Sequence, residues 1–299
     1  MKYRRLKKFL NKNKINFLEN ENLLKYNSMK INSISKIFIK IFKIQELEKL
    51  IKYMKLNNIK YYLLGNGSNI LFVDKIIKRP IIKLCFEDSI TINNSFVLVN
   101  ANMLNIKFSN YLKNEGYSNF EFLSVIPGSI GGGLYMNASC FGNSFSDNLL
   151  YVEVVDEKGK IRWIDQKDIE FKYRYSSLSR MNVIITRAIF KLNRSNKKDI
   201  DFKINEFKKM KSDIQPLEYP SCGSVFKNNK LKAYEYIIGA GLSGFLYKGA
   251  MISLKHANFI INYNNASGKS VLFIIEKILK KVYDKYKVHL ELEITLIRS

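Results

Sequence analysis

Two glycine-rich segments in the first half of the chain most restrict how it can fold. The first, Gly65–Asn69, separates two short apolar runs, and the second, Gly128–Gly133, has four glycines in six positions. The first arrangement is typical of a strand, a tight turn and a second strand. Glycine lets a backbone approach a ligand closely, and a turn that exposes backbone N–H groups can hold phosphate oxygens. Two such loops predict a large phosphate-containing cofactor, with two ordinary structural turns as the alternative.

Neither loop is a standard nucleotide-binding motif. In the dinucleotide fingerprint a third glycine would fall at Ile70, and a helix would follow where a strand is expected here. The segment Ala266–Ser270 resembles the end of a phosphate-binding loop, but the leading glycine of that motif would fall at Tyr263. We therefore reject a Rossmann site and nucleotide hydrolysis.

Along the rest of the chain, strand and helix patterns mix without a regular βαβ repeat, which predicts an α+β protein. Residues 1–28 are polar, basic and without a clear period, so we expect a loosely packed N-terminal lead-in. A hairpin is expected around Asp156–Gly159. The closing segment His289–Ile297 alternates apolar and polar residues and predicts a half-buried strand. Helices are expected from Gln45 and over 106–115, 202–210, 234–239 and 267–286, and strands over 81–85, 90–92, 96–99, 183–190 and 256–263.

The charge and the scarce Cys and His residues limit the partners. The chain carries 50 Lys and Arg against 26 Asp and Glu, a net charge of +24, but 41 of the basic residues are Lys and only 9 are Arg. Lys spread along the whole chain indicates a compositional bias, and we expect no nucleic-acid partner. Three cysteines and two histidines predict neither a disulfide framework nor a metal site. No apolar run is long enough for a membrane span and no secretory signal is evident, so we expect a cytoplasmic protein.

Several motifs, in order along the chain, resemble one enzyme family. The segments Leu64–Leu71, Ile126–Gly132 and Tyr135–Ala138 resemble the flavin-binding loops of UDP-N-acetylenolpyruvoylglucosamine reductases. The resemblance extends from about residue 27 to residue 297. The length of the chain is similar to that of the compact subclass of this family, which lacks a substrate-capping insertion. Asn32-Ser33 stands where the family usually has Gly-Gly. Further matching segments are Tyr173–Ser176, Gln215–Leu217, Pro220–Asn228, Ala240–Gly244, Ser253–Asn262 and Leu290–Glu293.

This resemblance implies an α+β, non-Rossmann architecture like that of vanillyl-alcohol oxidase. An FAD-binding domain over 29–195, with subdomains at 29–80 and 81–195, would precede a UDP-sugar-binding domain over 196–299. The FAD contacts that the resemblance implies are Gly65, Asn66, Gly67, Ser68, Asn69, Pro127, Gly128, Ser129, Gly131, Gly132, Asn137 and Ala138.

The resemblance also implies the reaction. NADPH would reduce FAD, and UDP-N-acetylglucosamine enolpyruvate would then be reduced to UDP-N-acetylmuramate, a step of peptidoglycan precursor synthesis in the cytoplasm. Arg174 would bind the enolpyruvyl carboxylate, Ser224 would protonate C2, and Glu293 would polarise the enol or orient a proton.

Lys227 and Asn228, beside the serine, are candidates for the substrate diphosphate, and a monomer is expected. The alternatives are another FAD-dependent oxidoreductase on the same flavin-binding fold and a basic nucleic-acid-binding protein. A buried, unreactive state of Cys222 is favoured over a reactive thiol, and we expect His256 to be structural or near the substrate.

Overall fold

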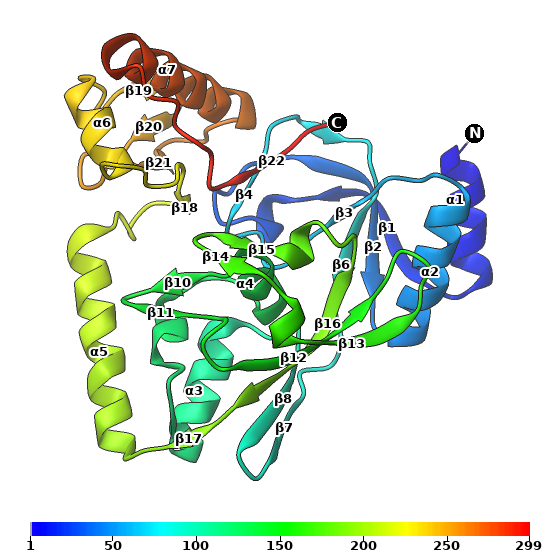
Figure 1. Ribbon diagram of the computed structural model, residues 1–299. Coiled ribbons are helices and arrows are strands. Elements are labelled where there is room, and N and C mark those ends of the chain that lie inside the picture. The colour runs from blue at the N-terminus through cyan, green and yellow to red at the C-terminus, as the bar shows by residue number, and fades with distance from the viewer. Residues whose placement is uncertain (1) are drawn as a thin grey trace. The chain divides into compact units, whose positions relative to one another are not determined.

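The computed structural model describes residues 2–299, which form two compact units (Figure 1). Unit 1 contains the chain up to Glu19 together with Ile37–Asn66 and Pro80–Lys209. Unit 2 contains Asn20–Lys36, Gly67–Arg79 and Met210–Ser299. The expected domains over 29–195 and 196–299 divide the chain by function and stay a prediction. The compact units divide it by packing, and two short N-terminal segments therefore belong with the C-terminal residues.

The N-terminal residues are well packed, so the expectation of a loose lead-in over 1–28 is wrong. Helix α1 (Lys2–Lys12) buries Leu6 and Leu10 completely in the core of unit 1. These leucines are four residues apart and therefore lie on one helical face. Phe9 stacks on Tyr53 with ring centroids 3.9 Å apart. Basic residues outnumber the apolar ones in this helix, so its composition suggests a loosely packed segment although its few apolar side chains share one face.

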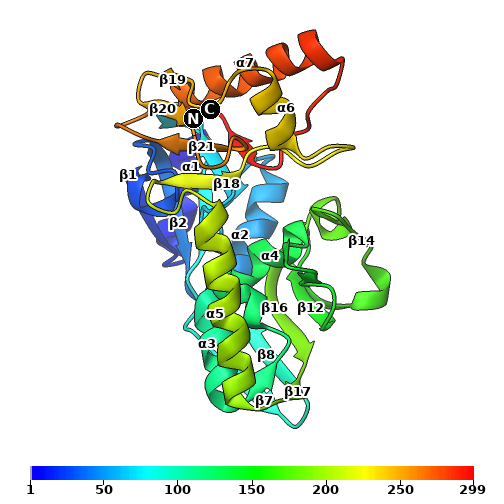
Figure 2. The same ribbon diagram turned by 90° about the vertical axis from the view of Figure 1, so that its left-hand side faces the viewer.

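Unit 1 is built around an antiparallel sheet in the order β13-β12-β16-β8-β7, beside which α3 and α4 lie (Figure 2). The expected hairpin is confirmed as β12 and β13, with Val155 opposite Ile161. Phe108, Phe120 and Phe190 pack against one another in its core, with ring centroids 5.4–6.0 Å apart. The bounds are β7 Ile90–Asn93, β8 Phe96–Asn100, α3 Asn105–Glu115, α4 Ile130–Met136, β12 Leu149–Val155, β13 Ile161–Asp165 and β16 Ile184–Lys191.

A parallel arrangement precedes this sheet along the chain. Strand β6 pairs in parallel with both β2 and β3, and α2 connects β2 to β3. The first residues of β2 lie in unit 2, where they pair with β5. The bounds are β1 Asn16–Asn22, β2 Ile34–Ile41, α2 Ile44–Leu56, β3 Tyr62–Leu63, β5 Ile76–Ile77 and β6 Ile81–Leu84.

Short elements complete the connections. The paired strands are β9 Tyr117–Ser118 with β17 Asn193–Arg194, β10 Ser139–Cys140 with β11 Asn143–Ser144, and β14 Phe171–Lys172 with β15 Tyr175–Ser176. Short 3-10 turns are η1 Leu24–Tyr26, η2 Glu121–Val125, η3 Gln166–Asp168 and η4 Ser177–Ser179, and helix α5 runs over Lys197–Ile214.

Unit 2 contains an antiparallel sheet in the order β18-β21-β20-β19 and the long helix α7. Helix α7 begins where expected, because the Ser267 hydroxyl accepts a hydrogen bond from the Ser270 amide at 3.1 Å. A separate parallel pair joins β4 to β22, and Gly268 lies so close to it that a Cβ atom would fall 1.9 Å from the Phe72 carbonyl oxygen. The bounds are β4 Ile70–Phe72, β18 Ser221–Ser224, α6 Ala233–Gly239, β19 Leu246–Tyr247, β20 Ala250–Ile252, β21 Phe259–Asn262, α7 Gly268–Tyr286 and β22 Thr295–Ile297.

The closing strand is much shorter than the alternation predicts. Only Thr295–Ile297 pairs as a strand, whereas the preceding residues run beside the Val225–Lys227 segment. There the Lys227 amide donates to the Glu291 carbonyl at 2.8 Å and the Glu293 amide donates to the Val225 carbonyl at 2.9 Å. The alternating pattern identified an extended segment, but the available partners decided which part of it joins a strand pair.

Candidate active site

The first glycine-rich loop presents a row of free backbone donors. Within residues 2–299, the amide N–H groups of Gly65–Asn69 donate to no protein acceptor. Gly67 has a φ of +70°, and a Cβ atom there would fall 2.0 Å from the Tyr26 carbonyl oxygen. Its own carbonyl accepts from the Ser28 amide at 3.0 Å. Glycine is therefore required at position 67, and the loop has the donors that bind anionic oxygens.

The second glycine-rich loop is held against the segment that follows β8. The Gly131 amide donates to the Ala101 carbonyl at 2.8 Å, and a Cβ on Gly131 would fall 2.9 Å from the Ala101 Cβ. A Cβ on Gly65 would lie 3.1 Å from the Ser129 hydroxyl oxygen. The two loops therefore meet at Gly65 and Ser129, which the sequence alone could not show. Gly128 has a φ of +147°, a conformation that disfavours other residues.

These loops fit the expected FAD. Their free amides suit a diphosphate, and the Asn102 side-chain oxygen beside the second loop is buried without a partner among the described residues. The Asn102 amide group itself is held by the Phe86 carbonyl at 2.8 Å, so the oxygen is fixed and available to a ligand N–H or O–H group. The ammonium group of Lys83 donates to the Gly65 carbonyl at 2.6 Å and places a positive charge next to this loop.

Asn137 and Ala138, also expected to contact FAD, shape the turn after α4. Asn137 has a left-handed backbone, and its side chain accepts from the Ser146 amide at 3.2 Å and donates to the Lys172 carbonyl at 3.3 Å. The Ala138 amide donates to the Gly133 carbonyl at 2.8 Å. Both residues therefore stabilise the turn that follows the second glycine-rich loop, and their contact with a cofactor stays a prediction.

Arg174 lies at the tip of the β14–β15 hairpin in unit 1, in a left-handed backbone conformation with φ of +55°. Its guanidinium donates to the Ser139 hydroxyl at 2.6 Å and lies over the Tyr173 ring at 5.0 Å from the centroid. These contacts hold a partly exposed guanidinium, whose planar fork suits recognition of a carboxylate.

Ser224 ends strand β18 in unit 2, opposite Phe259 of β21. The residues after it are clamped by Asn258, a residue that the sequence argument did not single out. The Asn258 side chain accepts from the Phe226 amide at 2.9 Å and donates to the Phe226 carbonyl at 2.8 Å. Its backbone carbonyl accepts from the Val225 amide at 2.9 Å. Ser224 itself is partly exposed, next to a segment that these hydrogen bonds hold in place.

Glu293 lies next to this segment, since its amide donates to the carbonyl of Val225, the residue after Ser224. The Asn69 side chain donates to the Glu293 carbonyl at 3.1 Å, and the Thr295 amide donates to the Asn69 carbonyl at 3.0 Å. Unit 2 thus brings Ser224, Glu293 and the end of the first glycine-rich loop together. Glu293 precedes β22 rather than lying on a strand, contrary to expectation.

The expected substrate residues differ in how they are engaged. The Lys227 ammonium pairs with Glu291 at 2.5 Å, an ion pair in which the glutamate side chain is 73% exposed. The Asn228 side chain accepts from the Ala233 amide at 3.0 Å near the start of α6. Lys227 joins the neighbourhood of Glu293 through this segment, whereas Asn228 is directed toward α6.

Two further side chains flank the serine segment. Burial raises the pKa of the Cys222 thiol to about 12, so the residue is a small buried side chain with an unreactive thiol. Burial lowers the pKa of His256, whose Nδ1 accepts a hydrogen bond from the Asn258 amide at 3.2 Å. His256 therefore contributes to holding Asn258 in place, and whether it also lies near the substrate stays a prediction.

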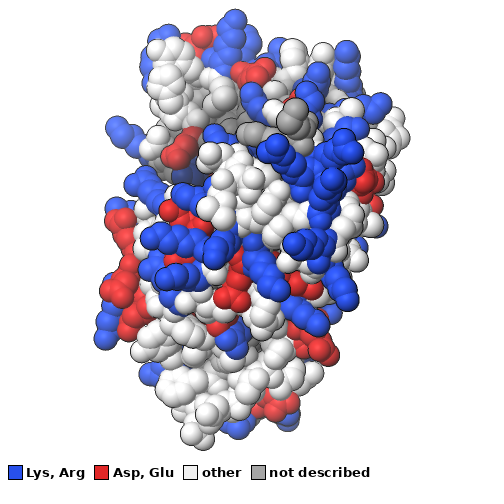
Figure 3. Space-filling view, turned by 90° about the vertical axis from the view of Figure 1, so that its right-hand side faces the viewer, with Lys and Arg blue, Asp and Glu red and all other residues white. Residues whose placement is uncertain are grey.

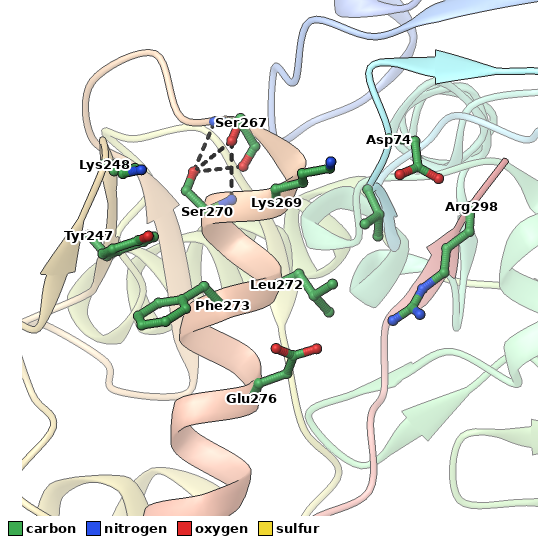
Figure 4. A pocket seen from close by; sticks show the side chains of 11 residues that line it. Asp74, Tyr247, Lys248, Ser267, Lys269, Ser270, Leu272, Phe273, Glu276 and Arg298 are labelled. Carbon is green, nitrogen blue, oxygen red and sulfur yellow. Dashed lines mark hydrogen bonds between the residues drawn. The ribbon is translucent and has the colours of Figure 1, made fainter.

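A separate cavity of about 610 Å³ lies at the start of α7 in unit 2 (Figure 4). It is lined by basic, acidic and aromatic groups, and Ser267 and Ser270 bond to each other at its edge. Neither Ser224 nor Glu293 lines it. Among residues 2–299 no cluster of His, Cys, Asp or Glu could hold a metal ion, and none of the helices described there is long and apolar enough to cross a bilayer.

The chain is similar to known proteins over nearly its whole length. Residues 36–165 match an FAD-binding domain, and residues 215–297 match the C-terminal domain of UDP-N-acetylenolpyruvoylglucosamine reductase. These matches agree with the expected α+β fold and FAD cofactor.

Relatives named UDP-N-acetylenolpyruvoylglucosamine reductase include those of Halalkalibacterium halodurans, 34% identical with 93% of each chain covered, and Carboxydothermus hydrogenoformans, 36% identical with 94% of this chain and 93% of the relative covered. The crystal structure of the reductase from Thermus caldophilus superimposes with a TM-score of 0.80 at 28% identity, covering 95% of this chain and 99% of that one. The chain therefore belongs to the UDP-N-acetylenolpyruvoylglucosamine reductase family.

Proposed function

We propose that the protein reduces UDP-N-acetylglucosamine enolpyruvate to UDP-N-acetylmuramate with NADPH, using bound FAD. The observation that carries this proposal is the position of Glu293 beside the residue that follows Ser224, in a chain of this family. A weak acid and a carboxylate held on adjacent rigid segments can protonate a carbon on which negative charge develops.

FAD would be held by the two glycine-rich loops. The free backbone amides of Gly65–Asn69 would bind its diphosphate, and residues 127–132, which approach Gly65 at Ser129, would contact the cofactor as well. When bound and reduced by NADPH, FAD would supply the hydride for the substrate double bond. The chain's own task is to keep the loops in place, which Gly67 and Gly131 do by allowing close approach of neighbouring backbone.

Three side chains would act on the substrate. Arg174 would bind the enolpyruvyl carboxylate through its planar fork, because the guanidinium remains charged and can form two parallel hydrogen bonds. Ser224 would donate its hydroxyl proton to C2, where a basic enolate carbon develops. Glu293 would orient that proton or polarise the enol from the adjacent segment.

Lys227 and Asn228 would contact the substrate diphosphate. Lys227 pairs with Glu291, whose side chain is largely exposed, and ion pairs of this kind contribute little stability. A substrate phosphate can therefore replace Glu291 as the partner of Lys227 at little cost. Asn228 uses its oxygen for the Ala233 amide, so its Nδ2 group would be the donor to the substrate.

We further propose a cytoplasmic monomer without a nucleic-acid partner. Figure 3 shows Lys and Arg side chains spread over one face with Asp and Glu among them. This distribution supports a compositional origin of the net charge of +24 rather than a basic stripe.

The decisive experiment separates the two half-reactions in the Ser224→Ala variant. FAD content and NADPH-driven flavin reduction should remain close to wild type, whereas substrate reduction should slow by ~10²–10⁴-fold, the usual contribution of a general acid. Stopped-flow absorbance measures both steps. Ser221→Ala, at the other end of β18, is the matched control and should leave both steps unchanged. An equal loss in both half-reactions of Ser224→Ala would refute the assignment.

A further inference from the structure

Lys83 contacts the first residue of the first glycine-rich loop. It lies on β6, in register with Lys40 of β2, and the neighbouring strand β3 leads directly into Gly65 (Figure 1). Its ammonium donates to the Gly65 carbonyl at 2.6 Å. No ion pair of Lys83 with a carboxylate is found within residues 2–299.

The positive charge of Lys83 has no carboxylate counter-ion among residues 2–299. Lys83 is half-buried, and burial lowers its pKa, with the charge of Lys40 acting in the same direction. One of its three N–H groups is used by the Gly65 carbonyl, and a partly desolvated cation gains most from a nearby anion. The free amides of Gly65–Asn69 belong to the same loop and favour an anion as well.

We propose that Lys83 is a positioning residue that fixes the Gly65 carbonyl and stabilises the FAD diphosphate on this loop through its charge. This inference rests on the proposed FAD-dependent function. The hydrogen bond to the Gly65 carbonyl holds the peptide at which the loop begins. The charge of Lys83 adds to these amides and favours the doubly anionic diphosphate over uncharged parts of the cofactor.

The test compares FAD binding by the deflavinated full-length protein and its variants. Lys83→Met should weaken FAD binding about 10- to 100-fold, the usual range for losing a hydrogen bond from a charged group. Binding of riboflavin, which lacks the diphosphate, should change less than about threefold. Lys83→Arg keeps the charge and should retain most of the FAD affinity. Fluorescence quenching of the flavin on binding provides the dissociation constants.

Lys40→Met is the matched control, because it removes a positive charge from the adjacent strand and keeps the bond from Lys83 to Gly65. Since the charge of Lys40 disfavours the charged form of Lys83, its removal should leave FAD binding as strong as in wild type. The inference is overturned if Lys83→Met and Lys40→Met bind FAD equally well. It is also overturned if Lys83→Met loses riboflavin and FAD affinity to the same extent, since the residue would then only support the fold. A wild-type protein without FAD affinity would refute the proposed function too, whereas equal FAD affinity of wild type and Lys83→Met refutes this inference alone.

Discussion

Replacing Asn258 by alanine should both destabilise unit 2 and slow substrate reduction. Asn258 is 3% exposed and Phe226 is 1% exposed, so the two hydrogen bonds that join them are shielded from water. The variant leaves the Phe226 amide and carbonyl without the side-chain partners that they have at 2.9 and 2.8 Å. The segment that carries Ser224 then loses the clamp on its C-terminal side.

The expected magnitude follows from these two bonds. A buried polar group left without a partner costs about 1–3 kcal/mol, so the two together predict a loss of about 2–6 kcal/mol in the free energy of unfolding. The backbone hydrogen bond from Val225 to the Asn258 carbonyl is retained, which keeps β18 beside β21. The variant should therefore fold, with a displaced serine.

Urea unfolding followed by circular dichroism measures the stability, and single-turnover oxidation of the reduced enzyme by substrate measures the reaction. Substrate reduction should fall about 10²-fold or more, because small displacements of a reacting group are costly. NADPH-driven flavin reduction should stay close to wild type. Asn264→Ala is the control, since its side chain is exposed and, among residues 2–299, bonds only to Asn265, so the change should cost less than about 0.5 kcal/mol.

The clamp hypothesis fails if Asn258→Ala unfolds at the same urea concentration as Asn264→Ala and reduces substrate at the wild-type rate. A stability loss without any change in substrate reduction would assign Asn258 to the fold alone and remove it from the positioning of Ser224.

Four further outcomes are expected. Arg174→Lys keeps the charge but loses the planar fork, so steady-state turnover should fall about 10²-fold while FAD content, read from absorbance, is unchanged. Iodoacetamide at pH 8 should modify the other two cysteines, which are partly exposed, before Cys222, whose pKa is about 12, and peptide mass mapping would show the order. Arg187→Met leaves the buried Glu153 carboxylate without its ion-pair partner and should lower the free energy of unfolding in urea by about 2–4 kcal/mol. Burial lowers the pKa of His256, so the stabilisation from its neutral ring is complete above the unfolded pKa near 6.5 and is lost as the pH falls below that value. The free energy of unfolding in urea should therefore drop between pH 7.5 and 5 in wild type, and it should drop less in His256→Gln.

Much of the local structure could be predicted from short-range patterns. The capping Ser267 and the apolar spacing after it predicted α7, and the Asp156–Gly159 turn predicted the hairpin of β12 and β13. Both depend on residues close in sequence, so each pattern contains its own structural partners. The predictions of a loose segment over 1–28 and of a strand over 289–297 were wrong for the opposite reason. The burial of Leu6 and the pairing of Glu293 depend on segments that are distant in the sequence.

The candidate site shows the same division. The sequence by itself determined which residues have suitable chemistry: glycines where a backbone must come close, a guanidinium fork at Arg174, and a hydroxyl at Ser224. Only the tertiary structure decided that Asn69 donates to the carbonyl of Glu293, 224 residues later in the chain, and that Lys83 lies beneath Gly65. Residue chemistry is a local property, whereas these contacts form because β4 pairs with β22 and β3 with β6, and a sequence contains no direct record of which strands will pair.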